Sequence, residues 1–402
     1  MIKRGIDLGG SQVRYGVSKD LIKTQAAKCM EIPINAPVKD YASKDVLSDF
    51  IIRRHPMAQL CGRRFVRDDA MDHYKGNVLY CDNQAVKVKQ EVTYINAAYV
   101  IAQDCYLQYF DEQDVQVTAC IPTSEFYSED SLVDGFKENL TGTFELEFPR
   151  VNKTITFTIQ PGDVKVVPEG VVAVYKYANE PGFCDGVTCV IDVGHRSTDI
   201  TLLKNFLPQG NSAVSRPKGG INIVSFVRSA LERDNILLNT EEIEYALSHR
   251  YVNQKGRLED VTDIVNSCNN DKEEVKSALL SRFGMVTPQE LDDAMNKYYI
   301  RQGSGVFDMT RYVTSAKKAF FSSIKEDIID VLAVEMQNIT SINNIVPIGR
   351  IFSGDIESED NAVNILMNTL YPNQSADARA QVYTNGSLAL ANIQEIMKLI
   401  DG

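Results

Sequence analysis

Two short segments of this chain place an aspartate before glycines in a pattern that suits phosphate binding. The first, residues 5–14, has the sequence G-I-D-L-G-G-S-Q-V-R. Glycines at the tip of a hairpin can turn backbone N–H groups toward a phosphate chain, because they carry no Cβ atom. Asp7, at the end of an apolar run, can hold a water of hydrated Mg²⁺, and Arg14 can reach the phosphates from the returning strand. The competing interpretation is a plain turn.

The second segment repeats this layout 185 residues later, counted from Asp7 to Asp192. Residues 190–200 have the sequence V-I-D-V-G-H-R-S-T-D-I, in which an apolar strand leads to Asp192, then Gly194, then hydroxyl residues. Two such hairpins, each leaving a buried strand, can face each other across a cleft and hold one phosphate chain from both sides. Two ordinary hairpins are the alternative, but their matching context favours phosphate binding.

A further carboxylate follows a third predicted strand. Residues 164–167 are V-K-V-V, and Pro168, Glu169 and Gly170 come directly after them. A carboxylate at such a strand end can orient the water that attacks a γ-phosphate. On the pattern alone, a solvated loop glutamate is the simpler interpretation.

The elements that must position these residues follow from hydrophobic periodicity. Helical spacing continues through much of residues 236–338, with a capping box at T-P-Q-E, residues 287–290. Residues 19–92 show no regular pattern. Because strands and helices alternate along the chain, the predicted fold class is α/β. Strands are predicted over 2–8, 13–17, 115–121, 153–159, 164–167, 187–193, 200–203 and 344–352, and further helices over 94–109, 220–231 and 387–400.

Length and charge limit the classes of function. The chain has 402 residues, too many for one ordinary core, so two or more domains are expected. Its formal net charge is −12, and an acidic surface lacks the cations that neutralise phosphates in direct DNA binding. Any link to DNA would therefore run through a basic adaptor protein. No apolar run approaches the ~18 residues of a membrane span, and the first residues lack the apolar stretch of a signal peptide.

The eight cysteines and four histidines form neither a metal motif nor a redox motif, since the sequence has no C-x-x-C pair and no H-E-x-x-H. A chain of this length does not depend on disulfides for its core, so the thiols are expected to be reduced and mostly buried. This composition predicts a cytoplasmic protein.

The two hairpins resemble those of the actin, sugar-kinase and heat-shock chaperone ATPase superfamily. Within it, the chain most resembles the ParM-type plasmid-segregation actins. Residues 154–199 have that family's order of features: an alternating strand, a turn, D-V-K-V-x-P-E, a variable helix and the second D-x-G hairpin. Residues 117–127 resemble its strand-Pro-hydroxyl-Glu-aromatic-Tyr segment, and residues 385–388 resemble the start of its closing helix. The likeness spans nearly the whole chain, and the hairpins and the Pro-Glu segment are its specific parts.

The resemblance implies a role for each matching residue. Asp7 and Asp192 would organise Mg²⁺ through waters, Arg14 would contact phosphate, and Glu169 would be the catalytic carboxylate. Glycines and serines of the two hairpins would line the phosphates, a glycine pair that opens the next helix would rim the nucleotide, and a last glycine would take the nucleoside. The residues that would line the phosphates are Gly9, Gly10, Ser11, Gly194 and Ser197. The glycine pair is Gly219 and Gly220, and the last glycine is Gly354.

Three departures from the family pattern stand out. The second hairpin has His195 and Arg196 where the family prefers a glycine and a threonine. These side chains must point away from the phosphates, unless Arg196 itself contacts the γ-phosphate; a solvent-facing Arg196 is the alternative. The nucleoside turn has the single Gly354 instead of a glycine pair. Residues 35–75 match no family pattern, and this region usually shapes filament contacts.

The resemblance predicts a two-lobed actin-like (ribonuclease H-like) fold with a nucleotide cleft between the lobes. Lobe I would comprise residues 1–180 with 383–402, and lobe II residues 186–370, with a helical upper part at 236–312. The implied function is a cytoplasmic ATPase that binds ATP or GTP with Mg²⁺, forms filaments and segregates plasmid or phage DNA. Its partners would be copies of itself and a DNA-binding adaptor.

Three alternative functions compete with this prediction. A small-molecule kinase of the same superfamily needs a carboxylate base facing a sugar hydroxyl, which the strand-end position of Glu169 disfavours. A chaperone-type ATPase would carry a substrate domain after the ATPase, whereas the sequence given stops near the expected closing helix. A structural polymer that binds nucleotide without cleaving it stays open.

Overall fold

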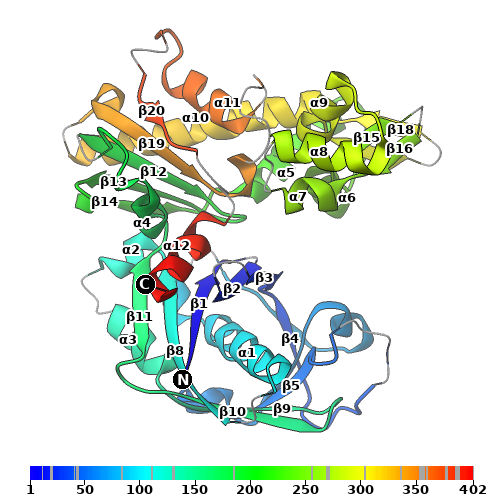
Figure 1. Ribbon diagram of the computed structural model, residues 1–402, viewed down its shortest axis with the longest axis vertical. Coiled ribbons are helices and arrows are strands. Elements are labelled where there is room, and N and C mark those ends of the chain that lie inside the picture. Colours follow the sequence, from blue (N-terminus) through cyan, green and yellow to red (C-terminus); the bar gives the residue numbers. More distant parts are fainter. Residues whose placement is uncertain are drawn as a thin grey trace. The chain divides into compact units, whose positions relative to one another are not determined.

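The computed structural model divides the chain into two compact units. Unit 1 comprises Met1–Lys176 and Asn392–Gly402, and unit 2 comprises Tyr177–Ala391 (Figure 1). Each unit combines a sheet with helices, which confirms the predicted α/β class. The residues described are 1–10, 12–18, 21–39, 41, 45–82, 85–109, 112–128, 132–183, 186–254, 257–268, 272–302, 305–335, 337–352, 358, 361–375, 379–384 and 390–401.

Unit 1 is built on an 11-stranded sheet in the order β3-β2-β1-β8-β10-β9-β5-β6-β4-β7, with β11 paired to β8. β8 pairs in parallel with β1 and with β11, so these three strands end at the same edge of the sheet. Their bounds are β1 Ile2–Leu8, β8 Glu112–Ile121 and β11 Val164–Pro168. The others are β2 Gln12–Ser18, β3 Leu21–Ala26, β4 Cys29–Ile32, β5 Asp49–Arg54, β6 Arg64–Val66, β7 Asn77–Leu79, β9 Gly142–Phe148 and β10 Lys153–Ile159.

Helix α1 (Glu91–Leu107) is buried over nearly its whole length and contacts β1, β9 and β10. This burial explains why its apolar residues do not keep to one stripe. The short α2 (Thr123–Phe126) follows β8, and α4 (Val171–Val174) begins two residues after Glu169. α3 (Leu132–Leu140) contacts β11.

Helix α12 (Ala391–Asp401) packs against the hairpin of β1 and β2. Gly5 and Gly16 face each other across that hairpin. A Cβ atom on Gly5 would lie 2.6 Å from Sδ of Met397, and one on Gly16 would lie 2.5 Å from its Cγ. The two glycines therefore leave the hairpin bare where the helix must approach it.

Unit 2 contains a five-stranded sheet in the order β14-β13-β12-β19-β20. The helices α5, α10 and α11 share one hydrophobic core with this sheet, and α10 contacts both of the others. The strands are β12 Val187–Val193, β13 Thr198–Lys204, β14 Leu207–Arg216, β19 Ile342–Ile348 and β20 Gln381–Val382. The helices are α5 Gly220–Arg233, α10 Thr310–Val334 and α11 Ala362–Leu370.

A helical insertion between α5 and α10 has its own small core, which includes Val252, Leu279 and Met295. The capping box predicted at its last helix is present: Thr287 Oγ1 accepts from the N–H of Glu290, and Glu290 Oε2 accepts from that of Thr287. Two hairpins interrupt the helices, so the expectation of a mostly helical stretch missed them. The elements are α6 Thr240–Ser248, β15 Tyr251–Gln254, β16 Arg257–Asp260, α7 Thr262–Ser267, α8 Lys272–Phe283, α9 Pro288–Asn296, β17 Tyr299–Gln302 and β18 Gly305–Asp308.

Two other sequence-based expectations were wrong. Residues 19–92 are not irregular, because they form β3 to β7. The strand predicted over 344–352 ends at Ile348, where Gly349 takes a φ of +116° and a 3₁₀ turn begins. Among the described residues, no helix combines the length and apolar character that a membrane span requires.

Candidate functional site

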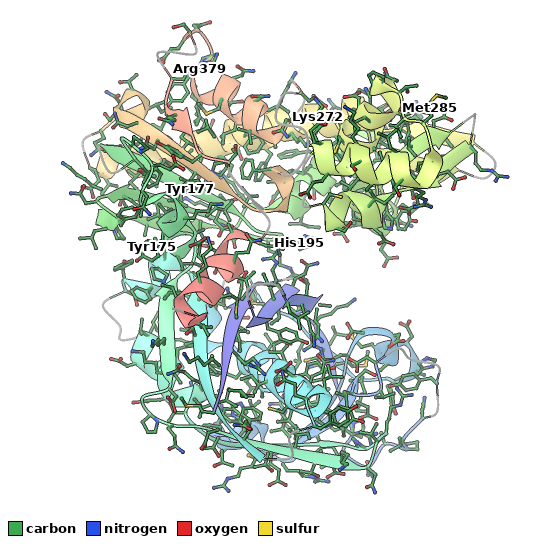
Figure 2. The ribbon with its side chains drawn as sticks, in the orientation of Figure 1. Tyr175, Tyr177, His195, Lys272, Met285 and Arg379 are labelled. Carbon is green, nitrogen blue, oxygen red and sulfur yellow. The ribbon has the colours of Figure 1, made fainter. Side chains whose placement is uncertain are left out.

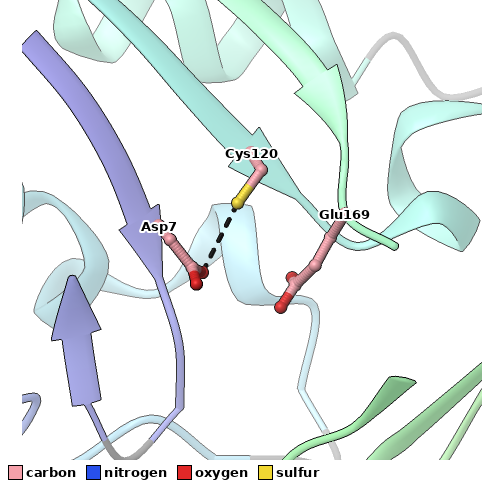
Figure 3. A group of neighbouring side chains, drawn as sticks. All are labelled: Asp7, Cys120 and Glu169. Carbon is pink, nitrogen blue, oxygen red and sulfur yellow. Dashed lines mark hydrogen bonds between the residues drawn. The ribbon is translucent and has the colours of Figure 1, made fainter. Parts of the chain in front are cut away.

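Three side chains meet where β1, β8 and β11 end (Figure 3). Asp7 lies opposite Cys120 in the β1–β8 register, and Glu169 follows the last residue of β11. The carboxylate and thiol atoms of Asp7, Cys120 and Glu169 all lie within 4.8 Å of one another. The Cys120 thiol donates to Oδ1 of Asp7 over 3.4 Å. The sheet therefore brings together two of the predicted carboxylates and a thiol that the sequence did not single out.

Arg14 belongs to the same cluster. It lies opposite Asp7 in the β1–β2 register, and its Nη1 is 3.0 Å from Oδ2 of Asp7. The Asp7 side chain is only 1% exposed, whereas that of Arg14 is 21% exposed. Asp7 thus holds the guanidinium at the rim of the cluster, where an anion could reach it.

The backbone of Glu169 is fixed from several directions. Its N–H donates to the carbonyl of Ile121 over 2.7 Å, and the Thr123 hydroxyl donates to its carbonyl. The next residue, Gly170, donates its N–H over 2.9 Å to Oδ1 of Asn392, the second residue of α12. The Glu169 side chain is 14% exposed. The simpler interpretation of Glu169 as a solvated loop residue is therefore wrong.

The Glu169 carboxylate forms an ion pair with Lys87, whose Nζ lies 2.9 Å from Oε2. Burial raises the pKa of Glu169, and the nearby ammonium opposes that rise. Burial by itself would lower the pKa of Lys87, but the negative charges of Glu169 and Asp7 raise it further than burial lowers it. Lys87 is therefore a protonated partner of the carboxylate.

Sequence reasoning missed Lys87. It lies in the 3₁₀ turn Lys87–Lys89 before α1, within the stretch that showed no regular pattern. The Glu125 carboxylate accepts from the N–H groups of Lys87 and Val88, over 2.6 and 3.0 Å. Glu125 was part of the family-like segment 117–127, but nothing in that segment indicates which backbone its side chain holds.

The cluster suits a hard cation held by carboxylates and water. Asp7 supplies carboxylate oxygen atoms, which are the ligands that Mg²⁺ prefers, whereas Oε2 of Glu169 is paired with the Lys87 ammonium. Burial raises the pKa of Cys120 well above its usual value, and the charges of Asp7 and Glu169 add to the effect. The protonated thiol is a poor ligand for a soft metal such as zinc. These residues fit the predicted Mg²⁺.

In unit 2, the second hairpin forms a turn closed by the N–H of Gly194, which donates to the carbonyl of Ser197 over 2.9 Å. Asp192 lies two residues before this turn, at the buried end of β12, and is 7% exposed. The first N–H groups of α5 hold the turn: Gly220 donates to the carbonyl of Gly194 over 3.0 Å, and Ile221 to that of His195 over 2.8 Å. The N-terminus of α5 therefore holds the turn in place through these two hydrogen bonds.

Gly219 allows this close approach. A Cβ atom there would lie 2.7 Å from backbone atoms of both His195 and Arg196. At Gly220, the nearest atom to a Cβ would be the carbonyl oxygen of His195, at 3.7 Å, which is an ordinary contact. The two adjacent glycines thus differ in how tightly they face the turn.

His195, labelled in Figure 2, faces the helical insertion. Its Nε2 lies 3.9 Å from Oε1 of Glu244 in α6. Burial lowers the pKa of His195, and the Glu244 carboxylate partly offsets this. The first departure from the family pattern therefore directs its side chain toward α6.

The predicted residues fall into two groups, one in each unit. Asp7, Arg14 and Glu169 share the unit 1 cluster, and Gly9 and Gly10 directly follow β1. The unit 2 residues gather around one turn: Asp192, Gly194, Ser197, Gly219 and Gly220. Ser11 and Gly354 lie outside the described residues.

No protein-family model and no curated protein sequence matches the chain. Solved structures do resemble it over nearly its whole length. The actin-like protein Alp7A matches with a TM-score of 0.67 and 12% identity, covering 99% of this chain and 95% of that one. A Bacillus thuringiensis ParM with ATP matches with 0.64 and 13%, covering 100% and 99%. Ta0583, an archaeal actin homolog, matches with 0.59 and 14%, covering 100% and 99%. The predicted actin-like fold of the ParM type is confirmed.

Proposed function

We propose that this chain is a filament-forming ATPase that uses ATP or GTP with Mg²⁺ and segregates plasmid or phage DNA through a DNA-binding adaptor. The observation that carries the proposal is the cluster in which Asp7 and Glu169, at the ends of parallel strands, are paired with Arg14 and Lys87. The Asp192 turn of unit 2, with the same strand–aspartate–glycine order, supports it. The likeness in fold to ParM and to an archaeal actin homolog supports the same function.

The residues suggest how the reaction proceeds. The glycine turn after Asp7 and the guanidinium of Arg14 would bind the phosphates. Glu169 would accept a hydrogen bond from a water and take its proton, while the water oxygen bonds to the γ-phosphorus. The bond from that phosphorus to the β–γ bridging oxygen breaks, which leaves a nucleoside diphosphate and inorganic phosphate. Asp7 and Asp192 would hold Mg²⁺ through waters, and this cation would neutralise charge on the phosphates.

The assembly part of the proposal concerns copies of this chain. Nucleoside triphosphate would favour filaments, and slow hydrolysis would mark older subunits for disassembly. The net charge of −12 disfavours direct contact with DNA, so a basic adaptor would make that contact, in the cytoplasm.

Sedimentation and light scattering with and without ATP–Mg²⁺ or GTP–Mg²⁺ test the assembly. We expect nucleotide-dependent pelleting at tens of micromolar protein. A chain that stays monomeric with both nucleotides refutes the filament function. Release of diphosphate only when a sugar is added would instead identify a small-molecule kinase.

The Glu169→Ala variant tests the hydrolysis. Because Glu169 would act on the water and not on the nucleotide, the variant should bind ATP and assemble, yet release phosphate on the order of 10²-fold more slowly. Its filaments should outlast those of the wild type. Glu138→Ala, at an exposed glutamate of α3, is the control and should behave as the wild type. Equal rates of phosphate release in Glu169→Ala and wild type would mean that another group positions the water.

A further inference from the structure

Lys87 is a buried cation to which the proposed reaction assigns no role. Its side chain is 10% exposed, and its ammonium lies 2.9 Å from Oε2 of Glu169. Burying an ammonium is costly, because it loses its hydration, unless a well-placed group of opposite charge offsets that loss. The chain keeps this cation beside the one carboxylate to which we assign the attacking water.

The backbone that carries Lys87 is fixed on both sides. The Glu125 carboxylate accepts from the N–H groups of Lys87 and Val88. The Thr93 hydroxyl donates to the carbonyl of Lys87 over 2.8 Å, and the Tyr94 hydroxyl donates to the carbonyl of Val88. Four hydrogen bonds from two helices thus set where the ammonium lies, as expected for a group whose position matters.

The charges around Glu169 explain what the ammonium does there. The Glu169 carboxylate shares the cluster with the like-charged Asp7, the thiol of Cys120 and the guanidinium of Arg14. Arg14 is paired with Asp7, and the Lys87 ammonium contacts Glu169 directly. It takes Oε2 and opposes the repulsion from Asp7, which leaves Oε1 as the oxygen that can face a water.

We propose that Lys87 is a positioning residue that holds the Glu169 carboxylate in its hydrolytic orientation and does not bind the phosphates. This inference rests on the proposed role of Glu169. It requires that loss of Lys87 lower kcat and leave nucleotide affinity unchanged, because the two properties depend on different groups. It also requires that Lys87 have no effect once Glu169 is gone.

The test compares Lys87→Met, Lys87→Arg and the control Lys89→Met, which removes an exposed lysine from the same 3₁₀ turn. Phosphate release gives kcat, and a fluorescent nucleotide gives the affinities for ATP and ADP. We expect Lys87→Met to lower kcat on the order of 10²-fold with affinities within about twofold of wild type. Lys87→Arg keeps the charge and should retain kcat within about tenfold. Lys89→Met should match the wild type.

A double variant decides whether Lys87 acts through Glu169. Lys87→Met with Glu169→Ala should be no slower than Glu169→Ala alone, because the two residues then form one functional unit. A double variant slowed by the product of the single effects would overturn the proposal. So would a Lys87→Met variant that loses affinity for ATP and ADP with kcat unchanged, since Lys87 would then be a phosphate ligand. If Lys87→Met changes neither kcat nor nucleotide affinity, the ion pair has only a structural role and the proposal is wrong.

Two further measurements keep the outcomes distinct. If Lys87→Met fails to fold, Lys87→Gln takes its place, because glutamine keeps a donor for Oε2 without the charge. If the wild-type chain releases no phosphate, the proposed hydrolytic function fails by itself. Crystal structures of wild type and Lys87→Met then decide the positioning. A Glu169 carboxylate that keeps its place without Lys87 refutes it, and a displaced one supports it.

Discussion

The adjacent glycines at the start of α5, both predicted to rim the nucleotide, allow a test of the second hairpin that leaves its own residues 192–197 unchanged. Gly219 and Gly220 are consecutive residues, and neither has a φ angle in the left-handed region. The cost of an alanine at either position therefore comes only from contacts between its Cβ atom and neighbouring atoms, not from backbone strain. We expect Gly219→Ala to displace the 194–197 turn and weaken nucleotide binding, and Gly220→Ala to do neither.

The distances give the size of the effect. A Cβ on Gly219 would lie 2.7 Å from backbone atoms of Arg196, whereas carbon contacts prefer about 3.5–4.0 Å. Backbone atoms have no rotamer to adopt, so the turn and the helix must separate by roughly 1 Å. Overpacking of this kind costs about 1–3 kcal/mol. The hydrogen bonds from Gly220 and Ile221 to the turn would lengthen as well, at about 1 kcal/mol each.

Nucleotide titration with Mg²⁺ and thermal unfolding measure the two consequences. A turn strained by 1–3 kcal/mol corresponds to about 5- to 150-fold in affinity, since each ~1.4 kcal/mol is tenfold. Gly220→Ala should keep wild-type affinity and gain up to about 1 kcal/mol, because alanine is the better helix former. Equal losses of affinity in the two variants would refute the steric reasoning. Unchanged affinity in Gly219→Ala would show that the turn does not contact the nucleotide.

Three other predictions follow from buried groups. Asp192→Ala should abolish Mg²⁺-dependent nucleotide binding at an unchanged melting temperature; unchanged affinity would contradict its assignment. Gly16→Ala should lower the free energy of unfolding by about 1–3 kcal/mol, because its Cβ would overlap Met397, and Met397→Ala should relieve part of that loss in a double-mutant cycle. Burial opposes ionisation of Tyr298, but the positive charges of Lys317 and Arg250 lower its pKa to about 8. Ionised Tyr298 therefore stabilises the fold as pH rises from 8 toward the ordinary value near 10, and this gain is lost as pH falls through 8; denaturation at several pH values should show it in wild type and not in Tyr298→Phe.

The two aspartate hairpins could be predicted because their signals are local. Strands β1 and β12 are buried, so each is a short apolar run, and each run stops at an aspartate and a glycine. The positions of Asp7 and Asp192 at buried strand ends follow directly. A turn and a strand end can be located in this way without knowing which strands pair.

The ion pair of Lys87 and Glu169 could not be predicted in the same way. The two residues are 82 positions apart, and they meet because β11 pairs with β8 while Glu125, after β8, holds the Lys87 turn. No periodic pattern encodes which strand lies beside which. The contact follows from the order of strands in the sheet, which the sequence pattern left undetermined.

The strands of residues 19–92 escaped prediction because their core is partly charged. Arg64 and Asp49 form a buried ion pair, and Arg67 is fully buried over the ring of Tyr99. Such residues look like surface positions in a sequence, so they hide the alternation that marks a strand. These buried charges pair with one another in the folded chain, but in the sequence they interrupt the alternation of apolar and polar residues.

The division of unit 1 into two pieces has a consequence for biosynthesis. A ribosome that has made Met1–Lys176 must translate all of Tyr177–Ala391 before the remainder of unit 1 appears. At ~5–20 residues per second, this takes on the order of 10–40 s. Throughout that interval, the nascent β1–β2 hairpin lacks α12, and Gly170, next to Glu169, lacks the Asn392 acceptor. The cluster around Glu169, the site that we propose for hydrolysis, is therefore completed only after translation of unit 2 has ended.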